Sequence, residues 1–121
     1  MVKALFDTNI LIDYLNGVPQ ARDELALYEE RAISIISWME VVTGAREEVE
    51  QATRAFLASF DVIGLTAPIA DLAVNVRRKR RSKLPDAIIE ASAAVHSMLL
   101  VTRNTKDFAT DSPFIRVPYI L

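Results

Sequence analysis

The chain lacks residues on which several common kinds of functional site depend. It has no cysteine and a single histidine, His96, among its 121 residues. Disulfide frameworks and thiolate metal sites are therefore excluded, and no catalytic-triad motif surrounds His96. Only three glycines are present, and no G-x-x-x-x-G-K segment occurs, which excludes a P-loop nucleotide site.

Long apolar runs are absent as well. The apolar stretch before Asp7 is too short for a secretory leader, and no run approaches the roughly 18 residues of a membrane span. With the absence of cysteine, this predicts a soluble, cytoplasmic chain with no membrane partner. The net charge is only −2, which by itself is not typical of a nucleic-acid-binding protein.

The positive charge that is present is concentrated in one segment. Six basic residues lie between positions 77 and 83: Arg77, Arg78, Lys79, Arg80, Arg81 and Lys83. Such a strip can bind phosphate while carboxylates elsewhere hold a metal, as a metal-assisted nuclease requires. The structural alternative is a solvated helix end, because cations favour helix C-termini.

Short apolar segments alternate with amphipathic ones along the chain. Strands are predicted at 2–6, 32–36, 62–65, 98–102 and 114–117. Helices are predicted at 10–15, from Pro19 onward, and at 37–46, 47–60, 66–80 and 86–97. Apolar strands that alternate with helices predict an α/β fold, with a mostly parallel central sheet and helices on both faces. We expect one domain over residues 1–121.

Four acidic residues stand where this fold would bring them together. Asp7 ends the first strand, Glu40 lies in the first turn of the next strand's helix, Asp86 begins the central helix, and Asp107 follows the fourth strand. Ligands of open parallel sheets bind at the carboxyl ends of the strands. Converging carboxylates raise one another's pKa unless a cation is present. Oxygen ligands without cysteine or histidine favour Mg²⁺, with Mn²⁺ possible.

Each acid taken alone also has a structural interpretation. Ser37 and Glu40 have the S-x-x-E spacing of a capping box. Asp86 could interact with the helix dipole, and Asp107 could be an exposed loop acid. Asp7 is harder to explain, because a charge at the end of a buried strand usually has a partner or a task. The metal site is therefore a hypothesis about all four acids together.

Three other polar or aromatic residues are given no catalytic role. Asp13, in the first helix, is expected to be exposed. His96 is expected to pack or to lie at the surface, and Trp38 to pack in the core or in a dimer interface, although it could stack on a base.

Four segments resemble, in order, the motifs of PIN domains. They are V-K-A-L-F-D-T-N-I-L-I-D at 2–13, S-W-M-E at 37–40, L-P-D-A-I-I-E-A at 84–91 and L-V-T-R-N-T-K-D-F at 100–108. The match spans nearly the whole chain. It is most similar to the VapC and FitB-like branch of bacterial toxins.

This resemblance implies an activity and partners. The expected protein is a Mg²⁺-dependent endoribonuclease that hydrolyses phosphodiester bonds of RNA, with tRNA or rRNA as substrate. It would be the toxin of a type II toxin–antitoxin module, a homodimer whose cognate antitoxin blocks the site.

The resemblance also implies roles for individual residues. Asp7 and Asp86 would be the main metal ligands, and Glu40 would complete the acidic pocket directly or through water. The fourth position is open between Asn104 and Asp107; we favour Asp107, with Asn104 as a hydrogen-bonding helper. Thr102 would orient a neighbouring carboxylate. Thr102 and the arginines of the basic segment are the candidate RNA contacts.

Two other classes of protein compete with this interpretation. A receiver-type signalling domain also binds Mg²⁺ in an acidic pocket. It needs adjacent acids after the first strand and an aspartate at the end of the third, whereas Thr8 follows Asp7 here and the third strand ends at Thr66. A catalytically silent PIN-like module that binds RNA or protein stays open, because Asn104 leaves the fourth position undecided.

Overall fold

The structure is a computed structural model that describes residues 2–121. Its elements are β1 (Lys3–Phe6), α1 (Thr8–Leu15), α2 (Pro19–Ala26), β2 (Glu30–Ser34), α3 (Ile35–Gly44), the 3₁₀ turn η1 (Glu47–Val49), α4 (Glu50–Leu57), β3 (Asp61–Ile63), α5 (Ala67–Arg80), α6 (Leu84–Val95), β4 (Leu99–Val101) and β5 (Ile115–Arg116). Within residues 2–121, no helix is both long and apolar enough to cross a membrane.

A five-stranded sheet of order β3-β2-β1-β4-β5 forms the centre of the fold, and each neighbouring pair is parallel. In the middle strand, Leu5 pairs with Ala32 of β2 on one side and Leu100 of β4 on the other. The predicted α/β fold is thus confirmed, and its sheet is parallel throughout. All strands end at the same edge, where ligands of such sheets bind.

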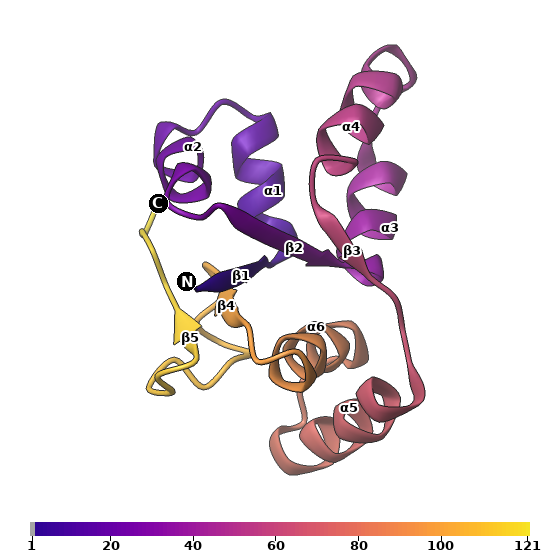
Figure 1. Ribbon diagram of the computed structural model, residues 1–121, viewed down its shortest axis with the longest axis vertical. Coiled ribbons are helices and arrows are strands. Elements are labelled where there is room, and N and C mark those ends of the chain that lie inside the picture. Colours follow the sequence, from indigo (N-terminus) through magenta and orange to yellow (C-terminus); the bar gives the residue numbers. More distant parts are fainter. Residues whose placement is uncertain (1) are drawn as a thin grey trace.

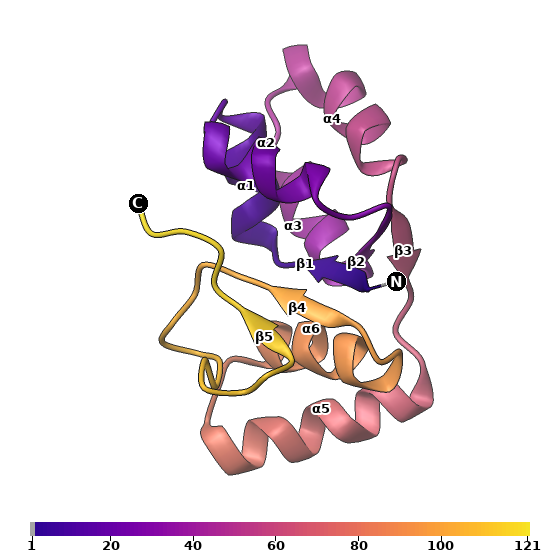
Figure 2. The ribbon, with the colours of Figure 1, turned by 60° about the vertical axis from the view of Figure 1, so that its left-hand side comes forward.

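Helices cover both faces of the sheet, as predicted (Figures 1 and 2). Successive side chains of a strand point to opposite faces. Phe6 packs against α1, α2 and α4, making edge-to-face contacts with Tyr28 and Phe60. Leu5 packs on the other face against Ile89 of α6. Helix α5 lies outside α6, on a smaller apolar cluster that includes Ile69 and Ala87. The acidic edge is therefore supported by two separate cores.

The start of α3 differs from the prediction. The helix begins at Ile35, and Ser34 is its N-cap, with its hydroxyl accepting from the Ile36 N–H at 3.1 Å. The interpretation of Ser37 and Glu40 as a capping box is therefore wrong, and Glu40 lies in the second turn of the helix. The strand ends two residues earlier than predicted for the same reason, because once Ser34 caps the helix residues 35 and 36 become helical.

The segment 47–60 also differs from the prediction of one helix. It comprises the 3₁₀ turn η1 followed by α4, which ends at Leu57. Of the four apolar residues expected to face inward, Leu57 is fully buried and Phe56 packs against the same core, whereas Val49 and Ala52 are exposed. Phe56 also stacks on Tyr14 of α1, with ring centroids 4.6 Å apart.

Candidate active site

Asp7 connects the central strand to α1 and is the most buried acid of the site. Its carboxylate caps α1, because Oδ1 accepts from the Thr8 N–H at 2.8 Å. Oδ2 accepts from the Thr102 hydroxyl at 2.7 Å and from Asn9 Nδ2 at 3.3 Å. Burial raises the pKa of Asp7. The two threonine hydrogen bonds lower this pKa, and the charges of Glu40 and Asp107 raise it further.

Thr8 joins the first strand's end to α3. Its hydroxyl lies 2.7 Å from Glu40 Oε1 and 2.9 Å from the buried Ser37 hydroxyl. Ser37, which does not cap the helix, thus helps to place the side chain that holds Glu40. Glu40 itself is exposed. A carboxylate held at one oxygen and open to solvent at this edge can act on a ligand directly or through water.

The loop after β4 contributes the third part of the site. The Thr102 hydroxyl, besides binding Asp7, accepts from the Asn104 N–H at 3.0 Å. Asn104 Nδ2 donates to Asp107 Oδ2 at 2.8 Å, and Asn104 Oδ1 accepts from the N–H groups of Lys106 and Asp107 at 3.0 and 3.1 Å. The amide of Asn104 therefore folds the loop and orients the Asp107 carboxylate.

Asp86 lies in the first turn of α6, just after Pro85, and is partly buried. Burial raises its pKa from the ordinary 3.8 to about 6, helped by the charges of the other acids, Asp7, Asp107 and Glu40. Lys83 acts in the opposite direction. Among residues 2–121, no hydrogen bond or ion pair is made to the Asp86 carboxylate.

The fold thus brings four acids from distant segments within electrostatic reach of one another. None of the four takes part in an ion pair within the described chain. Residues 2–121 contain no cluster of three or more His, Cys, Asp or Glu side chains that could by itself hold a metal ion. A ligand ion would therefore be held by one or two carboxylates and reached by the others through water, which is the usual coordination of Mg²⁺.

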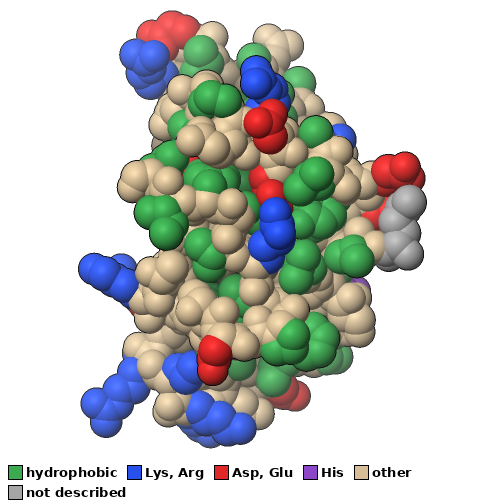
Figure 3. Space-filling model, turned by 90° about the vertical axis from the view of Figure 1, so that its left-hand side faces the viewer, with side chains coloured by type: hydrophobic (Ala, Val, Ile, Leu, Met, Phe, Trp, Pro, Cys, Tyr) green, Lys and Arg blue, Asp and Glu red, His purple; other side chains and the backbone are tan. Residues whose placement is uncertain are grey.

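The basic segment forms the last turn of α5 and the connection to α6. Arg77, Arg78 and Arg81 are exposed, while Arg80 forms an ion pair with Glu90 of α6. Figure 3 shows basic side chains gathered over the lower end of the molecule, which α5 forms. Lys83, at the end of this segment, lies near enough to Asp86 to influence its pKa. A positive surface therefore borders the acidic edge.

The three residues to which no catalytic role was given have other surroundings. His96 is exposed at the C-terminus of α6, and Trp38 packs on the core beneath Arg54, whose guanidinium lies 5.2 Å from its ring. The expectation for Asp13 was wrong: it is 5% exposed and paired with Arg103.

Three side chains of the site were given no functional role from the sequence: Thr8, Asn9 and Ser37. Their signal was local, since two of them directly follow Asp7 and the third lies one helical turn before Glu40.

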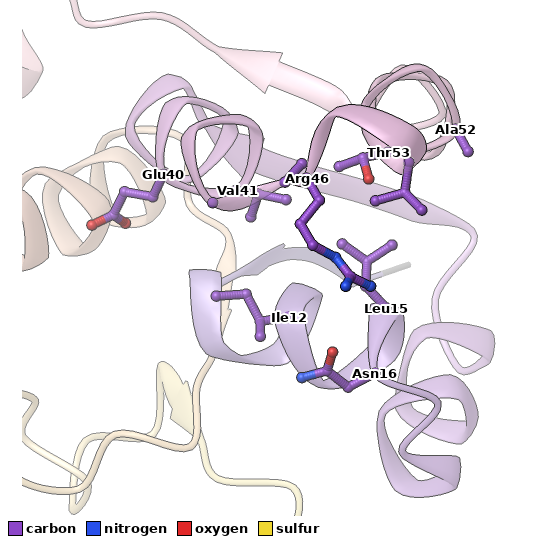
Figure 4. A pocket seen from close by; sticks show the side chains of 11 residues that line it. Ile12, Leu15, Asn16, Glu40, Val41, Arg46, Ala52 and Thr53 are labelled. Carbon is purple, nitrogen blue, oxygen red and sulfur yellow. The ribbon is translucent and has the colours of Figure 1, made fainter.

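A groove lies beside the acidic edge, between α1, α3 and the η1–α4 segment (Figure 4). Its volume is about 470 Å³, and its apolar lining includes Ile12, Leu15 and Val41. Arg46 projects into the middle of the groove, and Glu40 stands at one end. Because Glu40 lines the groove and is also one of the four acids, a peptide chain that fills the groove would reach the acidic edge.

Comparison with known proteins agrees with this architecture. The model of the PIN domain family matches residues 4–110. The ribonuclease VapC10 of Mycobacterium tuberculosis is 38% identical over 112 residues, covering 86% of this chain and 84% of the relative. The ribonuclease VapC19 of the same organism is 32% identical over 124 residues, covering 95% of this chain and 98% of the relative.

A solved structure is similar to this chain over nearly the whole length of both. A toxin–antitoxin complex from Klebsiella pneumoniae contains a chain that is 46% identical, with a TM-score of 0.93, and the match covers 98% of this chain and 100% of that one. The parallel sheet with an acidic edge is thus that of a PIN domain. The chain belongs to the PIN-domain family and, within it, to the VapC ribonucleases.

Proposed function

We propose that the chain is a metal-dependent endoribonuclease and the toxin of a toxin–antitoxin pair, with structured RNA such as tRNA or rRNA as its substrate. One observation carries the proposal. Four carboxylates from four segments meet at the sheet edge without ion pairing, and burial, together with the charges of the other three acids, raises the pKa of Asp86 to about 6. The names of the VapC relatives support the class of reaction.

The residues present fit a divalent cation. The donors are hard oxygen atoms, the acids carry uncompensated negative charge, and no cysteine or histidine lies among them, which suits Mg²⁺ or Mn²⁺. We assign Asp7 and Asp86 as direct ligands, and Glu40 and Asp107 as ligands through water. When bound, such an ion supplies an activated water and neutralises charge at the scissile phosphate.

The remaining side chains would orient these acids. Thr102 and Asn9 fix the Asp7 carboxylate, Thr8 holds Glu40, and Asn104 holds Asp107. This arrangement favours Asp107 as the fourth acid, with Asn104 as its positioning residue. Fixed carboxylates lose little freedom when a ligand binds, which is the advantage of a preorganised site.

The test is cleavage of purified tRNA and rRNA by the chain freed of any antitoxin. We expect discrete fragments with Mg²⁺ or Mn²⁺, none with EDTA, and recovery when metal is added back. Intact RNA after incubation with folded, metal-loaded protein would contradict the proposal for these substrates and favour the catalytically silent binding module.

We further propose that the end of α5 contacts RNA phosphate. Replacing Arg78 and Arg81 with Glu should weaken RNA binding and flatten its dependence on salt by about one to two units of slope, because each lost phosphate contact removes roughly 0.7 for single strands. Binding measured at several salt concentrations checks this. The matched control is Arg22→Glu with Arg54→Glu, on α2 and α4. Equal slopes for both double variants would assign the basic segment to an ordinary solvated helix end.

We also propose an antitoxin partner that occupies the groove between α1, α3 and α4. The similar Klebsiella pneumoniae structure is a toxin–antitoxin complex. The groove is apolar along Ile12, Leu15 and Val41 and ends at Glu40, so an amphipathic segment with a basic end would bury apolar surface and place its charge over the acids. An antitoxin segment bound in the groove would thereby block the acidic site.

A substitution in the groove should weaken this partner. Ile12 is 43% exposed, so Ile12→Glu should leave the fold intact but place a charge in the groove. We expect affinity for the antitoxin of the Klebsiella complex to fall roughly thirtyfold, the effect of losing an interface anchor. Val74→Glu is the control, because Val74 is 42% exposed on α5. Equal affinities of the two variants would place the partner elsewhere.

A further inference from the structure

Two buried carboxylates outside the acidic edge have matching surroundings. Asp13 of α1 is 5% exposed and Glu24 of α2 is 4% exposed. Asp13 accepts from Arg103 Nε and Nη2 at 2.7 and 2.9 Å and from the Tyr119 hydroxyl at 2.7 Å. Glu24 accepts from Arg116 Nε and Nη2 at 2.6 and 3.0 Å and from the Tyr28 hydroxyl at 3.0 Å.

The two clusters differ in where their arginines lie in the fold. Arg116 lies in β5, where backbone pairing with β4 already holds it. Arg103 lies in the loop after β4, between Thr102 and Asn104 of the acidic site. Its N–H donates to Asn9 Oδ1 at 3.2 Å, and Asn9 in turn donates to Asp7. The Asp13 cluster therefore bears on the loop that presents Asn104 and Asp107, whereas the Glu24 cluster secures the outer strand β5, whose Arg116 carbonyl accepts from the Thr102 N–H at 3.0 Å.

Arg103 also carries a charge that the site must exclude. An unpaired guanidinium one residue from Asn104 would be drawn to the neighbouring carboxylates, because opposite charges attract strongly at short range. There it would compete with any bound cation. The two-pronged contact with Asp13, completed by Tyr119 of the C-terminal tail, directs the guanidinium towards α1 instead.

We propose that Asp13 is a positioning residue of the active site: through Arg103 it fixes the loop that presents Asn104 and Asp107, and it keeps the arginine charge away from the four acids. Tyr119 contributes to this positioning, because its hydroxyl donates to the Asp13 carboxylate. The proposal rests on the proposed function in one respect, the assignment of the four acids as a metal site.

The experiment compares Asp13→Asn with Glu24→Gln, two isosteric changes in equally buried, equally bonded carboxylates. Both should lower the thermal midpoint by similar amounts. The first readout is metal-free amide hydrogen exchange at Arg103, Asn104, Lys106 and Asp107, whose N–H groups bind side chains of the site or its loop. We expect exchange there to rise about tenfold in Asp13→Asn and to stay near the wild-type rate in Glu24→Gln.

The second readout is Mn²⁺ affinity, which should fall about tenfold in Asp13→Asn only, the usual cost of losing an outer support of a metal site. Tyr119→Phe, a milder change, should shift both readouts in the same direction by less, which keeps the test valid if Asp13→Asn folds poorly. Equal loop exchange in the Asp13 and Glu24 variants would overturn the proposal. Absence of Mn²⁺ binding by the wild-type chain would instead overturn the proposed function, while the metal-free exchange still decides the role of Asp13.

Discussion

Asp7→Asn should reduce metal-dependent RNA cleavage by at least about a thousandfold, because the central ligand of the site would lose its charge. Charge stabilisation by a bound cation contributes several kcal/mol at the transition state, and each 1.36 kcal/mol corresponds to a factor of ten in rate. The measurement is single-turnover cleavage of the RNA that the wild-type chain cuts fastest.

The fold should survive this substitution. Asparagine is as good an N-cap as aspartate, so its Oδ1 can still accept from the Thr8 N–H. Its amide can donate to the Thr102 hydroxyl, which lies 2.7 Å from the native carboxylate. Asp71→Asn, which removes an exposed charge on α5, is the control and should cleave normally. Wild-type rates for Asp7→Asn would remove this residue from the site.

Asp86→Asn should reduce cleavage about as strongly as Asp7→Asn does. It should also stabilise the metal-free chain. The pKa of Asp86 is raised to about 6 by burial and by the charges of the other acids, so its ionised form is disfavoured in the folded state. At neutral pH the amide removes that repulsion. We expect the thermal midpoint without metal to rise by about 3 °C, a typical effect of a small stabilisation in a domain of this size.

The stabilisation should depend on pH with a definite sign. An acid whose pKa is higher in the folded than in the unfolded state binds more protons when folded. Wild-type stability should therefore fall as pH rises from about 4 to about 6, and Asp86→Asn should lack this part of the fall. The two midpoints should converge near pH 4. A constant difference across this range, or a less stable variant at neutral pH, would contradict the assigned environment of Asp86.

The order of helices and strands could be predicted because the chain repeats a simple physical pattern. Continuous apolar segments such as 99–101 suit strands covered on both faces, and amphipathic segments such as α5 suit helices that cover them. Boundaries were less certain where two residues offered the same local signal. Ser37 was expected to cap α3, but Ser34, which carries the same hydroxyl group, is the N-cap, and the pairing of β2 with β3 ends there.

The four acids could be located because parallel strands end at one edge, a rule that needs only the strand order along the chain. Asp13 could not be placed in the same way, because its partners Arg103 and Tyr119 are 90 and 106 residues away. A weak signal existed: Asp13 follows the buried Ile10 by three residues and so shares its helix face. An acid on a buried face requires partners, but the sequence does not say which ones.

Titration of the metal-free chain with Mn²⁺ tests the central claim most directly, since every proposed role depends on cation binding at this edge. Calorimetry at about pH 7.5 should record saturable binding by the wild-type chain and by Asp71→Asn, and loss of that binding in Asp7→Asn and Asp86→Asn. Binding that persists unchanged in both site variants, or its absence from the wild-type chain, would contradict a metal site built on Asp7 and Asp86.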